Sequence, residues 1–214
     1  SKVRPSELLR SATGISVGSE TMTLPRAVAA YARHHGGSVE LVAEPRELPG
    51  GEAAKDGWTV AQDGNICWAG RHVQLYRLRP NPQGSGLAAV IATSYGNWTV
   101  AVDDKPWSNR WNEAVLDPVF GPDGKRVAAA VRNDGVWTIA IDGQPWDAVF
   151  DTVWDPVFSP GGDRVVARVQ KNGGFALAID GRLSQRSYER LWDPVFSPDG
   201  TKLLIRAVDD GKYV

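Results

Sequence analysis

Short apolar runs alternate with turn residues from residue 39 to the end of the chain. Between residues 116 and 153, three turn sequences separate four such runs, at 117–120, 126–131, 136–141 and around 146–150. The turns are Pro122-Asp123-Gly124, Asp134-Gly135 and Asp142-Gly143. Asp-Gly between β-type runs predicts a tight hairpin, because such a turn needs residues with positive φ. We therefore expect four antiparallel strands joined by three hairpins.

The same pattern returns at a fixed period. Residues 154–162 read Trp-Asp-Pro-Val-Phe-Ser-Pro-Gly-Gly, and residues 116–124 and 192–200 carry close copies. Asp117, Asp155 and Asp193 hold the same place in the three copies and are 38 residues apart. A four-stranded meander repeated at this spacing is typical of β-propeller blades. We predict an all-β protein in which residues 37–214 form a propeller-like array of about four blades and a partial fifth.

The first 36 residues stand outside the repeat and are expected to be helical or irregular. Residues 24–33 are the best helix candidate, because Thr23 can cap the helix and Pro25 lies in its first turn, where a missing N–H costs little. Residues 6–12 are a second, shorter candidate. The predicted domains are therefore 1–36 and 37–214.

Two runs of the repeat unit carry expectations about packing. The third run, 136–141, is apolar almost throughout, as expected of a strand enclosed between neighbouring blades. The second run includes Val-Ala-Ala-Ala-Val at 127–131, whose small side chains suit a close approach of blades near the axis. We expect both strands to be buried, and the third to be sandwiched.

Nine tryptophans in 214 residues are unusual. Seven of them hold repeat positions, so we interpret them as packing between blades rather than as electron relays, since every blade packs alike. The three positions are those of Trp58, Trp98 and Trp137, of Trp107 and Trp146, and of Trp154 and Trp192. Trp68 and Trp111 fall outside this register and are predicted to lie at the surface.

Candidate catalytic and metal-binding groups are few. Asp117, Asp155 and Asp193 each precede a proline in the same local setting, so we favour a structural role, accepting backbone N–H bonds, over catalysis. The histidines are His34, His35 and His72, and the one cysteine is Cys67. This set is too small for a zinc, iron–sulfur or covalent haem site. We expect no catalytic residue, no metal and no cofactor.

Charge and composition exclude several classes of protein. The chain has 24 basic and 25 acidic residues, a net charge of −1, so no basic excess favours nucleic acid or an anionic membrane. No apolar run approaches the roughly 20 residues of a membrane span, and no signal-peptide core follows the first residues. A single cysteine cannot form a disulfide within the chain, which favours a cytoplasmic location.

Subtracting the repeat leaves residues that are candidates for binding a partner. Arg, Trp and Tyr are enriched at interface hot spots, and several of them lie in the outer segments that do not repeat. The predicted partner surface comprises Arg71, His72, Arg110, Trp111, Arg182, Arg186, Tyr188 and Arg190. The alternative interpretation of these residues is a solvated outer strand without a partner.

The Trp-Asp-Pro-Val-Phe-Ser-Pro-Asp-Gly motif resembles the TolB-type, WD-like propeller repeat over about residues 39–214. With Gly-Val-Trp-Thr-Ile-Ala-Ile-Asp-Gly-Gln-Pro-Trp at 135–146, the chain is similar to the TmcD family. These proteins are tryptophan-rich subunits of the Tmc transmembrane electron-transfer complex of sulfate-reducing bacteria. The resemblance implies a cofactor-free, non-enzymatic scaffold whose partners are redox subunits of a membrane complex.

Two other functions stay open. A propeller-class hydrolase or small-ligand-binding protein would place its site on the axial channel, although the acidic residues here recur periodically. A self-assembling protein would complete its last blade with another copy, because the sequence reaches Val214 in the third strand of a blade. The apolar Leu203-Leu204-Ile205 would otherwise invite aggregation at an edge, so that interpretation predicts a homodimer.

Overall fold

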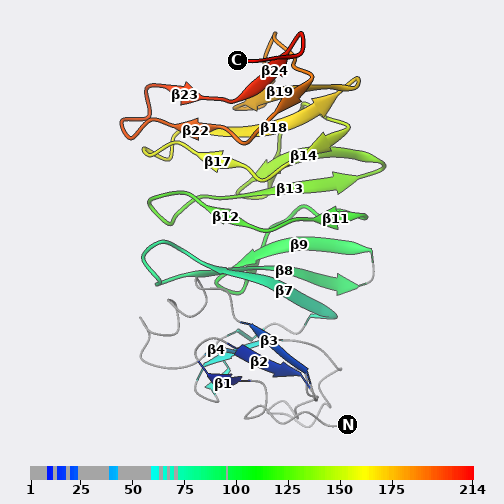
Figure 1. The fold of residues 1–214 in the computed structure, drawn as a ribbon. Helices are drawn as coiled ribbons and strands as arrows, with labels where there is room; N and C mark the ends of the chain where they lie inside the picture. Colours follow the sequence, from blue (N-terminus) through cyan, green and yellow to red (C-terminus); the bar gives the residue numbers. More distant parts are fainter. Residues whose placement is uncertain are drawn as a thin grey trace. The chain divides into compact units, whose positions relative to one another are not determined.

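The computed structural model describes residues 9–11, 14–17, 20–23, 39–42, 59–62, 65–66, 68–69, 72–94 and 96–214. Every helix or strand among these residues is a β-strand, so the all-β prediction is confirmed (Figure 1). Along the same residues, no helix has the length and apolar content that crossing a bilayer requires. The chain divides into two compact units, Ser1–Pro106 and Trp107–Val214.

The unit Ser1–Pro106 contains three antiparallel sheets. One consists of β1 (Leu9–Ser11), β2 (Gly14–Val17) and β3 (Glu20–Thr23). A second consists of β4 (Val39–Val42), β5 (Thr59–Gln62) and β6 (Asn65–Ile66). The third, the β8 sheet, consists of β7 (Gln74–Pro80), β8 (Leu87–Ser94), β9 (Asn97–Val102) and β10 (Lys105–Pro106), in the order β10-β9-β8-β7.

The N-terminal strands correct part of the sequence prediction. A helix over residues 6–12 is wrong where β1 (Leu9–Ser11) pairs with β2, and strands begin well before residue 39. Ile15 and Val17 alternate with small residues along β2, and β3 carries two β-branched threonines, so both match the period of a strand. The helix predicted at 24–33 lies outside the described residues.

The unit Trp107–Val214 holds the clearest copies of the repeat. The β13 sheet consists of β11 (Ala114–Val115), β12 (Val119–Phe120), β13 (Val127–Asn133), β14 (Val136–Ile141) and β15 (Gln144–Pro145). The β18 sheet consists of β16 (Thr152–Val153), β17 (Val157–Phe158), β18 (Val165–Lys171), β19 (Gly174–Ile179) and β20 (Arg182–Leu183).

The last sheets of this unit follow the same order. They consist of β21 (Arg190–Leu191), β24 (Ala207–Asp209) and β25 (Lys212–Tyr213), and of the hairpin of β22 (Val195–Phe196) with β23 (Leu203–Leu204). Within each five-stranded sheet the first strand is split in two, since β11 and β12 both pair with β13, and β16 and β17 with β18. Each predicted four-stranded meander is therefore present, with an interrupted first strand.

The hairpin turns form where Asp-Gly and Asn-Gly stand in the sequence. Asp134, Asp142, Asn172 and Asp180 have φ between 49° and 51°, and each is followed by a glycine with positive φ. Asp180 also ties its turn to the next strand, because its Oδ1 accepts a hydrogen bond from the Val165 amide N–H at 2.8 Å. Asp142 accepts from the Val127 amide at the same distance. Turn chemistry therefore fixes the register of both sheets.

The second strand, and not the third, is the most deeply buried strand of each sheet. Five consecutive residues of β13, from Val127 to Val131, are fully enclosed, whereas only Ile139 and Ala140 of β14 are. The expectation of a third strand sandwiched along its whole length is therefore wrong. The pairing explains the difference, since β14 meets β15 only at Ala140 and Ile141 and the rest of that edge is less covered.

Small side chains let the β13 and β18 sheets pack face to face, as the Ala-rich second strand predicts (Figure 1). Alternate residues of each strand point to opposite faces, so β18 contributes to two cores. The core between the two sheets contains Ala128, Ala130, Ile139, Phe150, Val153, Ala167, Val169, Ala176 and Ala178. The core on the other face of the β18 sheet contains Val166, Leu177, Leu191 and Ala207.

Tryptophan on glycine is a second recurring contact between neighbouring sheets. A Cβ at Gly143 would lie 3.0 Å from the Trp107 side chain, and a Cβ at Gly181 would lie 3.2 Å from that of Trp146. Both glycines have φ of 80° or more. The Asp-Gly turns therefore need glycine twice over, for the backbone conformation and for the close approach of an indole.

The tryptophans divide differently from the prediction. Trp98, Trp137, Trp146, Trp154 and Trp192 are half-buried at the margins of the cores, whereas Trp68 and Trp111, expected at the surface, are 3% and 5% exposed. Trp68 lies 39 residues before Trp107, which lies 39 before Trp146, so it belongs to their repeat position. Trp58 lies outside the described residues.

The Asp-Pro positions join arginines inserted between sheets. The Asp193 carboxylate lies 3.2 Å from the Arg168 guanidinium, which stacks 4.1 Å above the Trp154 ring and donates to the Leu191 carbonyl at 2.8 Å. Arg206 stacks in the same way on Trp192, at 4.5 Å. Asp193 is therefore a partner of an arginine, and the predicted backbone hydrogen bonds of the three aspartates stay a prediction.

Candidate functional site

The outer segments are the parts of the sheets where the repeats differ most. We define them as residues 144–152 of the β13 sheet and 182–190 of the β18 sheet. Both follow the same path, since Phe150 bridges to Trp137 and Tyr188 bridges to Phe175. Residues 38 apart along the two segments therefore occupy equivalent places, and differences in side chain are not caused by differences in backbone.

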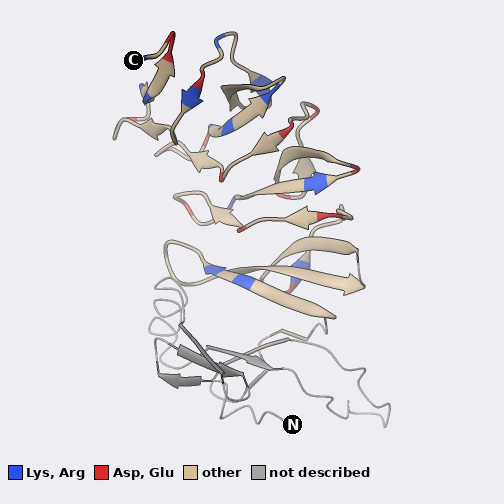
Figure 2. Cartoon of the chain, turned by 45° about the vertical axis from the view of Figure 1, so that its right-hand side comes forward, with Lys and Arg blue, Asp and Glu red and all other residues tan. Residues whose placement is uncertain are grey.

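Three arginines distinguish the outer segment of the β18 sheet. Arg182, Arg186 and Arg190 are exposed and recur every fourth residue. The equivalent residues of the β13 sheet are uncharged: Gln144, Ala148 and Thr152. Figure 2 shows more basic colour on the sheets near the C-terminus than on the β13 sheet. These arginines are not needed to form the sheet, because its neighbour forms without them.

Arg186 is held in place by two contacts. Its guanidinium forms an ion pair with Asp209 and lies 5.3 Å from the centroid of the Tyr188 ring. The hydrogen bond to the Asp209 carboxylate, with the charge of that group, raises the pKa of Arg186 above its usual value. Sequence reasoning missed Asp209, which is far along the chain and comes close only through the pairing of β24 with β21.

Arg182 lines a shallow hollow of about 510 Å³ beside the same edge. Arg164 and Asp180 form an ion pair at 3.3 Å on one side of the hollow, and Leu183, 43% exposed, lies on another. The hollow therefore offers a positive charge next to an exposed apolar side chain. Such a surface suits contact with a protein that presents carboxylates beside apolar groups.

Two residues of the predicted partner surface belong to the core. His72 and Trp111 are 4% and 5% exposed, so their placement on a surface is wrong. They precede Phe150 and Tyr188 at steps of 39, 39 and 38 residues, and thus share one repeat position that is filled by varied rings. That spacing was the feature of the sequence from which their burial could have been predicted. Arg71 lies outside the described residues.

Arg110 is half-buried and serves its own segment. Its guanidinium donates to the backbone carbonyls of Trp107 and of Asn109. It also lines a pocket at the outer edge of the β13 sheet, far along the chain from Arg182, Arg186 and Arg190. The predicted surface is therefore divided between the exposed outer segment of the β18 sheet and this separate pocket.

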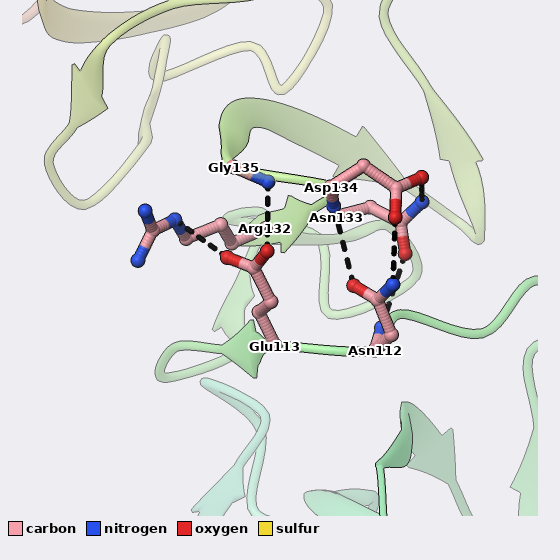
Figure 3. Close-up of polar contacts among 6 residues, drawn as sticks. All are labelled: Asn112, Glu113, Arg132, Asn133, Asp134 and Gly135. Atoms are coloured by element: carbon pink, nitrogen blue, oxygen red, sulfur yellow. Dashed lines mark hydrogen bonds and ion pairs between the residues drawn. The ribbon is translucent and has the colours of Figure 1, made fainter.

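A polar network fixes the chain just before β11 (Figure 3). Glu113 pairs with Arg132 at 2.8 Å and accepts the Gly135 amide N–H at 2.7 Å. Asn112 exchanges hydrogen bonds with Asp134, whose carboxylate also accepts from Asn133. Asp151 accepts the Asn172 amide at the equivalent place in the β18 sheet. The network is thus a structural clamp on the second hairpin of each sheet.

An apolar groove of about 580 Å³ runs across the short first strands of three successive repeats. Its walls are the Val-Phe pairs of β12, β17 and β22 with the neighbouring prolines, and Ser159 is its polar member. Among the described residues, no group of three His, Cys, Asp or Glu side chains is placed to hold a metal ion. The groove suits an apolar ligand.

No family model matches the chain, and no curated protein matches it. Its structure is similar to that of TolB from Acinetobacter baumannii, at 14% identity and a TM-score of 0.41, covering 91% of this chain and 57% of that one. It is similar to the Dos1 propeller at 12% identity and a TM-score of 0.46, covering 90% and 57%. A puromycin hydrolase follows at 15% identity and 0.37, covering 82% and 37%. The chain thus spans about 57% of the first two proteins' length.

Proposed function

We propose that this protein is a non-catalytic interaction subunit that docks an acidic surface of a partner protein through the outer segment of the β18 sheet. The observation that carries the proposal is the row of Arg182, Arg186 and Arg190, exposed where the neighbouring sheet has uncharged residues. Arginine forms bidentate contacts with carboxylates and is enriched at interface hot spots. Tyr188 adds an aromatic ring beneath Arg186.

The partner in this proposal is a redox subunit of a membrane-associated, Tmc-type electron-transfer complex on its cytoplasmic side. The support for it is the tryptophan-rich repeat, which resembles the TmcD family, and on this proposal the stacked sheets are blades of a TolB-type propeller. The mechanism is geometric. Repeated clamps make the sheets rigid, and a rigid array presents the arginines without an ordering cost on binding.

The proposal is tested by charge reversal at the edge. A variant with Arg182→Glu and Arg190→Glu should no longer be retained by the electron-transfer subunits in detergent extracts of the cells that produce the protein. Retention of the native chain should fall as salt rises, since exposed charges are screened. A control with Lys125→Glu and Lys202→Glu makes the same change in net charge at exposed residues of other loops and should bind normally. Equal retention of both variants contradicts the proposal.

A second candidate function is ligand binding in the Val-Phe groove, where three repeats contribute to one apolar wall. It corresponds to the axial-channel site of a propeller-class ligand-binding protein or hydrolase. Phe158→Ala would weaken such a ligand and leave the edge-dependent retention intact. If instead Phe158→Ala abolishes retention, the groove and not the edge holds the partner.

A further inference from the structure

A pocket of about 390 Å³ opens at the outer edge of the β13 sheet. Its volume is within the range of small-molecule sites. Indole, valine and proline side chains make up its apolar walls, and amide, carboxylate, hydroxyl and guanidinium groups stand beside them. The lining residues are Asn109, Arg110, Trp111, Asn133, Asp134, Val136, Thr138, Pro145, Trp146 and Val149.

Two exposed valines of this pocket have no role in the repeat. Val136 and Val149 are 42% and 41% exposed. In the β18 sheet the equivalent residues are Gly174 and Ser187, so the fold is satisfied there without an apolar side chain. Arg110 itself lies 39 residues before Val149, at the same repeat position. Exposed valines that the fold does not require point to an apolar ligand.

Internal contacts hold the walls of the pocket. The Trp111 ring packs edge-on against Trp107, with 6.1 Å between centroids. The Thr138 hydroxyl donates to the Trp146 and Ala148 carbonyls at 3.2 and 2.8 Å. Since these groups are already fixed, a ligand would bind without a large ordering cost.

Arg110 supplies a positive charge that no acidic side chain offsets. Arg126, Arg132, Arg164, Arg168 and Arg186 each have a carboxylate within ion-pair distance, but among the described residues Arg110 has none. Its Nη1 donates to backbone carbonyls, which hold the guanidinium at the pocket without neutralising it. A half-buried, unbalanced guanidinium beside indole rings suits an anion attached to a flat apolar group.

We propose that this pocket binds an aromatic carboxylate, with its ring between the tryptophan and valine side chains and its carboxylate on Arg110. Asp134 is the one acidic residue in the lining, and its charge opposes such a ligand. Both of its carboxylate oxygens are engaged, Oδ1 by the Asn112 amide group at 2.8 Å and Oδ2 by that of Asn133 at 2.7 Å (Figure 3). Its repulsion is therefore softened but present, which gives the proposal a test in the opposite direction.

The test is a titration followed through the indole N–H signals in ¹H–¹⁵N correlation spectra. Indole-3-acetate should shift a small subset of these signals, and the neutral indole-3-acetamide should bind roughly 10-fold more weakly, as loss of a charge-assisted contact predicts. Arg110→Gln should lower the affinity for the acid by a similar factor and abolish the preference over the amide. Arg182→Gln, an exposed arginine of the other sheet, is the matched control and should change neither.

Asp134→Asn keeps the turn, because Asn tolerates the left-handed backbone at this residue, where φ is 50°. It should tighten the acid by roughly 2- to 3-fold, as removal of a partly screened like charge predicts. This variant keeps the proposal falsifiable if Arg110→Gln unfolds. A peptide ending in a free Trp carboxylate, compared with its C-terminal amide, distinguishes a chain terminus from a free small acid as the source of the ligand.

Equal binding of indole-3-acetate and indole-3-acetamide overturns the proposal. So does an Asp134→Asn variant that binds the acid no more tightly than the native chain. Absence of any shift for both the free acid and the peptide up to millimolar concentration overturns it as well. Tighter binding of either the peptide or the free acid, with the preference for a carboxylate retained, supports it and names the source.

Discussion

The outer segments of the β13 and β18 sheets share one backbone path and present opposite surfaces. The first is apolar and uncharged where it meets solvent, with Val136, Val149 and Pro145. The second is basic, with exposed arginines at 182, 186 and 190. The comparison teaches that the positions common to both sheets form the fold, and that the departures from the repeat are where binding is to be sought.

Removal of a shared core ring should have the largest effect. Phe150 is 1% exposed, and Phe150→Ala should destabilise the protein by about 3–5 kcal/mol. Tyr188, its half-buried equivalent, should cost roughly half as much, because less apolar area leaves water there. Chemical denaturation of the two variants measures both values. Equal losses would show that the two sheets do not use this position alike.

Two glycines separate backbone strain from steric contact. Gly135 and Gly143 both have φ of 83°, but a Cβ at Gly135 meets nothing within 4 Å, whereas one at Gly143 meets Trp107 at 3.0 Å. Gly135→Ala should therefore cost about 1–2 kcal/mol, the penalty of a left-handed L-residue. Gly143→Ala should cost about 1–2 kcal/mol more, since the indole must shift. Identical unfolding free energies would exclude the tryptophan-on-glycine contact as a source of stability.

The arginine between sheets can be exchanged for the alanine of the preceding repeat. Arg168→Ala places at this position the residue found at Ala130, and it removes the stack on Trp154 and the donor to the Leu191 carbonyl. We expect a loss of about 1–3 kcal/mol. Unfolding curves of this variant and of Lys125→Ala, an exposed control, provide the measurement. A neutral outcome would mean that the alanine packing suffices in both sheets.

The loops before the second strands should differ slightly in their response to acid. The hydrogen bond from Ser159 is the main cause that holds the pKa of Asp163 below its usual value. A lowered folded-state pKa adds stability above the unfolded pKa of about 3.9, and this contribution is lost as the pH falls through the lower folded value. Ser159→Gly, which copies Gly121 of the β13 sheet, should make the unfolding midpoint depend less on pH below about 4.

Thermal unfolding of both forms across this acidic range provides the measurement. A variant with the same slope as the native chain would contradict the role of Ser159.

Local chemistry made much of the fold predictable. Asp-Gly and Asn-Gly gave the hairpins because few other sequences accept two residues of positive φ, and the Ala-rich run at 128–130 correctly indicated close sheet packing. Burial of individual rings was harder. A register shift in β8, between Ala92 and Ser94, changes the spacing of that sheet by a residue, so the places of Trp68 and Trp111 in the repeat were missed.

The candidate sites were only partly predictable. Arg182, Arg186 and Arg190 were found because they lie outside the repeat, and they are exposed. The ion pair of Arg186 with Asp209 was not, because it depends on strand pairing across the chain. The exposure of Val136 and Val149 was not either, since an apolar residue in a strand is expected to be buried unless the coverage by neighbouring strands is known.

The central claim is that departures from the repeat carry binding and repeated positions carry the fold. It is tested most directly by giving the β18 sheet the outer segment of its neighbour, through Arg182→Gln, Arg186→Ala and Arg190→Thr. The account predicts an unfolding free energy within about 1 kcal/mol of the native chain, because exposed ion pairs contribute little, together with loss of retention by the electron-transfer subunits. Retention equal to that of the native chain, or a loss of several kcal/mol, would contradict it.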